Sequence, residues 1–63
     1  MRDWHVYKWE EEGLWLLEVI PAAEDPWSRL MLGRNVQLQK VATLHSQPVE
    51  VAEAIVAVMR IKR

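Results

Sequence analysis

The sequence predicts an α+β fold: an antiparallel sheet of three strands, or four if a short central stretch is also extended, with a C-terminal α-helix packed on one face of the sheet. Residues 4–20 contain two strand-like apolar runs on either side of Glu11-Glu12-Gly13, which is the pattern of a β-hairpin. Residues 46–63 repeat apolar side chains at helical spacing. Because 63 residues leave room for only one core, we expect residues 1–63 to form a single domain.

The turn of the hairpin determines which residues face each other across the two strands. A three-residue loop at Glu11-Glu12-Gly13 would be a type I turn followed by glycine in the left-handed conformation. A two-residue loop would place Glu12 at positive φ, which suits Asn or Asp better. We therefore predict the three-residue loop, in which Trp9 faces Trp15 and the helix covers one aromatic face of the hairpin, formed by Tyr7, Trp9, Trp15 and Leu17.

The other face of the predicted hairpin is about half apolar, whereas a sheet face in water is normally polar. The chain has no Cys, so neither a disulfide nor a thiolate zinc site can stabilise so small a core. We therefore predict a homodimer or higher homo-oligomer, formed by packing of this face or by pairing of a free edge strand. The expected protein interface combines this face with an apolar flank of the helix: Trp4, Val6, Leu14, Leu16, Ile20, Val58 and Ile61.

The middle of the chain allows two interpretations. Asp25-Pro26 is a suitable helix start, and Gly33 a suitable stop, so residues 25–33 favour a short helix. The alternative is a short strand over residues 29–32. Alternating side chains predict the next strand over residues 35–45, and Ser46 is the expected N-cap of the C-terminal helix.

No group of residues in the sequence indicates catalysis. His5 and His45 are the only imidazoles, and neither lies in a motif with a nucleophile and an orienting acid. The three consecutive glutamates at the hairpin turn lack the ligand spacing of a calcium loop. Two glycines are too few for a phosphate-binding loop. We expect a protein without enzymatic activity, metal or cofactor.

The order strand, turn, strand, strand, helix has Glu11-Glu12-Gly13-Leu14-Trp15 at the turn and Pro48-Val49-Glu50-Val51-Ala52-Glu53-Ala54-Ile55 opening the helix. In this order and these segments the chain resembles HicB-like antitoxins. The resemblance implies a partial RNase H-like βββα domain that dimerises and that binds and masks a small toxin. As a short, Trp-rich chain without Cys, it also resembles accessory proteins of bacteriophages.

These observations favour a small regulatory protein that binds another protein, antitoxin-like or inhibitor-like. The alternative is a nucleic-acid-binding regulator with a basic C-terminus and a stacking tryptophan, in which the contacts would be Trp27, Arg34, Arg60, Lys62 and Arg63. A formal net charge of −1 argues against it, because phosphate binding relies on a basic surface. The sequence has neither a signal peptide nor an apolar run long enough to span a bilayer, so we expect a cytoplasmic protein that does not enter a membrane.

Overall fold

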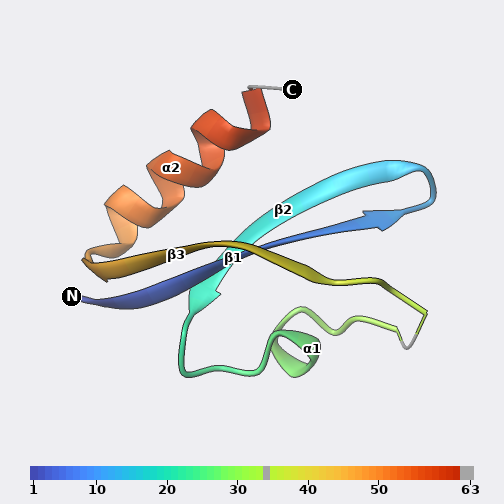
Figure 1. The fold of residues 1–63 in the computed structure, drawn as a ribbon, viewed down its shortest axis with the longest axis horizontal. Coiled ribbons are helices and arrows are strands. Elements are labelled where there is room, and N and C mark those ends of the chain that lie inside the picture. The colour runs from blue at the N-terminus through green and yellow to red at the C-terminus, as the bar shows by residue number, and fades with distance from the viewer. Residues whose placement is uncertain (34, 62–63) are drawn as a thin grey trace.

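The computed structural model describes residues 1–33 and 35–61, and it confirms the α+β fold (Figure 1). The elements are β1 (Arg2–Glu11), β2 (Leu14–Pro21), α1 (Pro26–Arg29), β3 (Gln39–Gln47) and α2 (Val49–Ile61). The strands are antiparallel and lie in the order β2-β1-β3, so β1 is central and the described residues form no fourth strand. No helix within these residues is long and apolar enough to cross a membrane.

The hairpin closes with a two-residue turn, not the predicted three-residue loop. Glu12 and Gly13 both have positive φ, 51° and 80°, as a type I′ turn requires. Trp9 therefore faces Leu16, and the predicted Trp9–Trp15 pair is wrong. The physical reason is twist: a type I′ turn matches the right-handed twist of the two strands, which offsets the cost of a left-handed glutamate.

The new register changes which face of the sheet the helix covers. Residues that face each other across an antiparallel pair point to the same side, so Val6 shares a face with Val19, and Lys8 with Leu17. Met59 of α2 lines a groove together with Lys8 and Leu17, which identifies this side as the helix face. Val6 is completely buried there.

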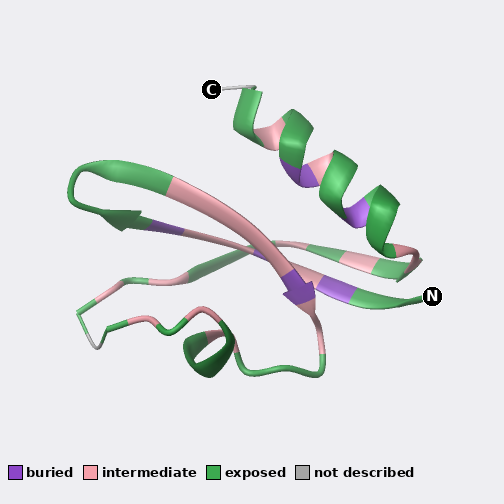
Figure 2. Ribbon diagram, turned by 180° about the vertical axis from the view of Figure 1, so that it is seen from behind, coloured by how far each residue is buried: buried purple, intermediate pink, exposed green. Residues whose placement is uncertain are grey.

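The opposite face carries Tyr7 and Trp9, so their predicted position under the helix is wrong. This face is covered as well, because Trp9 and Ile20 are only 6% and 2% exposed. Residues 22–33, including α1, and residues 35–38 run along that side of the sheet, while α2 lies on the other (Figures 1 and 2). The sheet is therefore a middle layer, and both faces supply the buried apolar residues: Trp4, Val6, Trp9, Ile20, Ala52 and Val56.

The predicted half-apolar exposed face is accordingly wrong. Three residues assigned to it are buried within the chain: Trp4 at 7% exposure, Val6 at 0% and Ile20 at 2%. Leu16 is half-buried. The shift of register distributes this predicted face over both sides of the sheet, and each side is covered by another part of the same chain. The residues of the predicted interface that remain exposed are Leu14, Val58 and Ile61.

The middle of the chain contains a short helix, as favoured, and not a strand. The Asp25 carboxylate caps α1 by accepting a hydrogen bond from the Ser28 backbone N–H at 3.2 Å, and Pro26 occupies the first helical position. The helix ends at Arg29, four residues before the predicted stop at Gly33. The third strand begins at Gln39 instead of residue 35 and continues two residues beyond the predicted end.

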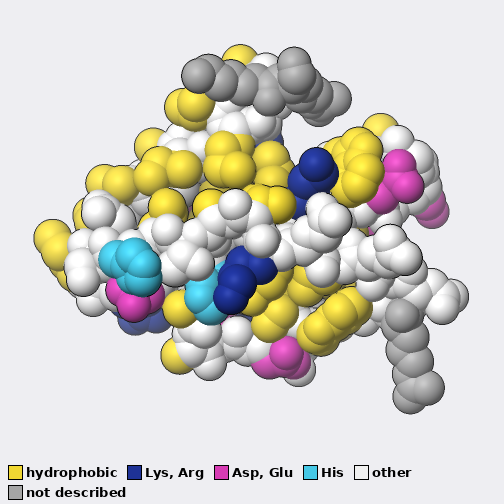
Figure 3. All heavy atoms as spheres, in the orientation of Figure 1, with side chains coloured by type: hydrophobic (Ala, Val, Ile, Leu, Met, Phe, Trp, Pro, Cys, Tyr) yellow, Lys and Arg dark blue, Asp and Glu magenta, His cyan; other side chains and the backbone are white. Residues whose placement is uncertain are grey.

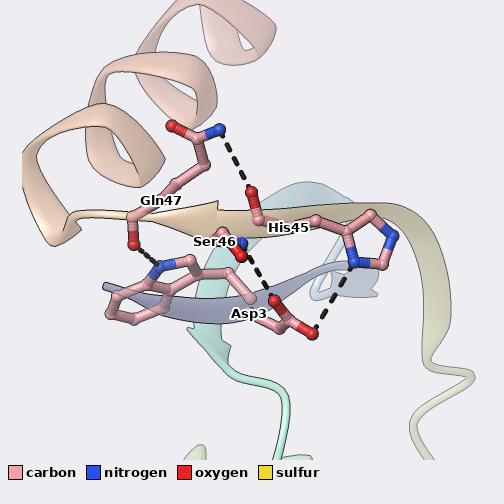
Figure 4. A network of polar contacts seen from close by, with 5 residues as sticks. Asp3, His45, Ser46 and Gln47 are labelled. Carbon is pink, nitrogen blue, oxygen red and sulfur yellow. Dashed lines mark hydrogen bonds and ion pairs between the residues drawn. The ribbon is translucent and has the colours of Figure 1, made fainter.

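Ser46 is not the N-cap of α2 but a residue of β3, with φ at 52°. Its backbone N–H donates to the Asp3 carboxylate at 2.9 Å, and the Trp4 indole N–H donates to the Gln47 carbonyl at 2.8 Å (Figure 4). These contacts with β1 extend the strand, and α2 begins only after Pro48, whose carbonyl accepts the first helical hydrogen bonds.

Candidate binding groove

A groove of about 570 Å³ lies between β2 and the C-terminal half of α2. Its floor and walls are mostly apolar, with charged side chains at three positions. The residues that line it are Lys8, Trp9, Trp15, Leu16, Leu17, Glu18, Met59 and Arg60. A mostly apolar cleft with a few charged groups is the usual composition of a ligand site in a protein, and the described residues form such a cleft here.

Trp15 is the main apolar side chain of the groove that remains in solvent, with 55% exposure. Its position in β2 opposite Glu10 places the indole on the helix face, near the turn and beyond the part of the sheet that α2 covers. The Lys8 ammonium lies 4.5 Å from the ring centroid, a cation–π contact that orients the indole. A large aromatic side chain is thus held in place on the surface without being buried by its own chain.

Arg60 connects the end of α2 to the outer edge of β2. Its guanidinium donates to the Leu17 carbonyl and lies 3.8 Å from the Glu18 carboxylate. The Ala22 N–H donates to the backbone carbonyl of Asp3, so these two residues form a hydrogen-bonded pair of the β1–β2 ladder. Hydrogen-bonded and non-hydrogen-bonded pairs alternate along an antiparallel ladder, which makes Lys8 and Leu17 a non-hydrogen-bonded pair. The backbone groups of Leu17 therefore point away from β1, so Arg60 occupies part of a free strand edge.

The charges in the groove are unequal. Arg60 is paired with Glu18, whereas Lys8 makes no ion pair within residues 1–33 and 35–61. Two cations against one carboxylate give the lining a formal charge of +1 in a chain whose total is −1. The groove therefore offers an apolar floor beside one cation that is free to meet an acidic group.

The predicted interface residues do not gather at this groove. Leu16 lines it, Leu14 lies at the hairpin end on the sheet face opposite to Trp15, and Val58 and Ile61 lie on the exposed flank of α2. The sequence prediction missed Lys8 and Met59 as site residues, and it assigned Trp15 to the core because the wrong register placed this indole beneath the helix. The two-residue turn at Glu12-Gly13, which the sequence also allows, would have placed Trp15 opposite Glu10 and so have identified it as a residue of the groove.

The predicted nucleic-acid contacts are divided between the two sides of the sheet. Trp27 is exposed on α1, and Arg60 belongs to α2 on the opposite side (Figure 1). Arg34, Lys62 and Arg63 lie outside the described residues. The two contacts that the structure describes therefore do not form one surface.

The two histidines have structural contacts. His5 shares a hydrogen bond of 3.3 Å between its Nδ1 and the Tyr7 hydroxyl. His45 Nδ1 lies 3.6 Å from the Asp3 carboxylate, which also accepts the Ser46 N–H (Figure 4). That backbone hydrogen bond, aided by His45, lowers the pKa of Asp3 below its ordinary value of 3.8. Within the described residues, no three His, Asp or Glu side chains are grouped to hold a metal ion.

No family model matches this chain, and comparisons with curated proteins and with solved structures also found no match. The function must therefore be argued from the groove itself.

Proposed function

We propose that this protein is a non-catalytic binding protein that holds an apolar segment of another protein in the groove between β2 and α2. The observation that carries the proposal is the half-exposed Trp15, oriented by Lys8 above an apolar floor. Tryptophan is enriched at the centres of protein interfaces, where it supplies much of the binding energy. The exposed part of this indole is apolar surface that its own chain leaves in water and that a partner could bury.

The lining defines the chemistry of the bound segment. A bulky apolar side chain would pack between the Trp15 indole and Met59, above Leu17. An acidic residue next to it would pair with Lys8, the cation in the lining that has no ion pair within the described residues. A regulatory role of the antitoxin or inhibitor kind, to which the HicB-like resemblance also points, fits such a segment. The cytoplasmic location stays a prediction.

Nucleic-acid binding is the alternative, and it has less support. Arg60 already pairs with Glu18 and donates to the Leu17 carbonyl, so a phosphate would compete with both. The exposed Trp27 lies on the other side of the sheet from Arg60. A nucleic acid would have to reach around the molecule to contact both residues.

The two exposed tryptophans make a matched test, because one lies in the groove and the other on the opposite side. Tagged parent, Trp15→Ser and Trp27→Ser chains would be used to capture partners from a lysate of the native host, with and without nuclease. We expect Trp15→Ser to lose a protein that the parent and Trp27→Ser both retain. The proposal is wrong if Trp15→Ser retains every partner of the parent, or if nuclease releases what was captured.

A salt series on the captured complex separates the two functions independently. An apolar contact with one ion pair should change little in affinity as salt is raised, whereas several phosphate contacts would make the affinity fall steeply. Binding of the parent measured by calorimetry at low and high salt therefore gives opposite results for a protein partner and for a nucleic acid.

A further inference from the structure

Helix α2 carries two apolar stripes, although the sheet covers only one of them. The inner stripe includes Ala52 and Val56, which are buried against the sheet. The outer stripe consists of four exposed residues with spacings of three, four and three, which places them on one side of a helix: Val51, Ala54, Val58 and Ile61. Figure 3 shows hydrophobic side chains gathered over α2 on the face of the molecule that is turned toward the viewer. Val58 and Ile61 are 52% and 81% exposed.

We propose that the outer stripe is the contact surface for a second copy of this chain, with α2 packed antiparallel against α2 of the partner subunit about a two-fold axis. A two-fold contact joins a surface to itself, so the surface must be self-complementary. An axis passing between Ala54 and Val58 places Ala54 against Val58 of the partner subunit. The same axis places Val51 against Ile61 of the partner subunit, so small side chains meet larger ones and the helices can approach closely.

The absence of charge from the outer stripe favours a second copy as the occupant. Two identical surfaces repel each other wherever a charged residue lies near the axis, because it meets its own sign. No residue of the outer stripe is charged; Glu53 and Arg60 lie on another side of α2, and Glu50 lies at the border of the stripe in the first turn, away from the proposed axis. A charge-free stripe on a helix with a separate charged side is compatible with its own copy.

The core supplies a second argument. Within residues 1–33 and 35–61 it has only six buried apolar residues, and the chain contains no Cys that could reinforce them with a disulfide. Domains of this size are marginal on their own core, and association of subunits is a common way to stabilise them. Burial of the outer stripe would extend the core through α2, which already contributes Ala52 and Val56 to it.

Pairing of a free strand edge, the other route to a dimer, is hindered at both edges of the sheet. Arg60 occupies the Leu17 carbonyl at the edge of β2, and Pro21 at its end has no N–H to donate. The edge of β3 has two breaks in register and an exposed Lys40, features by which natural sheets prevent edge pairing. The helix is therefore the better surface for a second copy.

The test uses two neighbouring positions on the same helix. Val58→Glu introduces a charge into the outer stripe, whereas Ala57→Glu introduces the same charge at an exposed position outside it. Sedimentation equilibrium from micromolar to submillimolar concentration should show the parent and Ala57→Glu as dimers with dissociation constants within about threefold, and Val58→Glu weaker by about a hundredfold or more. Far-UV circular dichroism checks that each variant is folded.

Cysteine cross-linking tests the antiparallel arrangement in a chain that has no cysteine of its own. Ala54→Cys and Val58→Cys chains, mixed and oxidised, should form a disulfide between the two different chains more readily than either forms one with itself. A parent that stays monomeric over the whole concentration range would overturn the proposal. Equal weakening by the two glutamate variants, or preferential cross-linking of each cysteine chain to itself, would overturn it as well.

Discussion

Replacing Trp9 and replacing Trp15 should have very different effects on stability, although both residues are tryptophans of the same hairpin. Trp9 is 6% exposed, and its indole N–H donates to the Glu11 carboxylate at 3.0 Å. Removing such a buried aromatic side chain costs about 3–5 kcal/mol. Trp15 is 55% exposed and has a cation–π contact with Lys8, so Trp15→Ala should cost only about 1 kcal/mol.

The expected total stability sets how the difference would be observed. A domain of 63 residues has about 3–9 kcal/mol in total, so Trp9→Ala should lose at least about a third of the free energy of unfolding and Trp15→Ala a much smaller share. Trp9→Phe, which keeps a ring but loses the hydrogen bond, should remain folded with a loss of about 1–2 kcal/mol. Urea denaturation followed by far-UV circular dichroism measures all three, since these substitutions alter the fluorescence signal itself.

The predicted three-residue loop removes this difference, because it places both Trp9 and Trp15 beneath the helix. A Trp15→Ala variant that is destabilised as much as Trp9→Ala, or more, would refute the register described above. Equal and small effects from both substitutions would show that the second face of the sheet is not covered.

Two further predictions concern the turn and the strand ends. Glu12→Asn should stabilise the hairpin by about 0.5–1 kcal/mol, because Asn tolerates positive φ better than Glu does. Gly13→Ala should cost about 1 kcal/mol, because Ala tolerates positive φ less well than Gly does. The urea midpoints of the two variants must therefore move in opposite directions. The pKa of Asp3 is lowered in the folded state, chiefly by the Ser46 N–H, so its contribution to stability is complete above the ordinary pKa of 3.8 and is lost as the pH falls through the folded value. Asp3→Asn should therefore be less stable than the parent near neutral pH, and the gap should narrow in acid; a gap that is constant with pH would contradict this.

The sequence predicted a sheet of three or four strands followed by a terminal helix, but it missed the register that defines the groove. Local turn preference disfavoured Glu12 at positive φ, and the twist of the paired strands outweighed that preference. Leu16 and Leu17 are apolar neighbours that point to opposite faces and are both half-buried, as is typical of a strand covered on both faces, and this pair was the signal against an exposed face.

The start of α2, the end of β3 and the contact at the edge of β2 depend on residues far apart in sequence. Ser46 has the side chain of an N-cap, but its N–H is held by Asp3, 43 residues away. Arg60 is a typical basic residue of a last helical turn, and only the folded chain brings it to the Leu17 carbonyl. Sequence periodicity cannot indicate such partners, and the contact of Arg60 with β2 forms one wall of the groove.

The location of the partner is tested most directly by photo-cross-linking from the two exposed tryptophan positions. Benzoylphenylalanine at position 15 keeps a large aromatic group in the groove, and the same residue at position 27 reports on the opposite side of the sheet. If the groove binds a protein segment, irradiation in the native host's lysate should attach one defined protein to the position 15 chain and not to the position 27 chain. Cross-linking of that protein from position 27 alone would contradict the groove as the binding site.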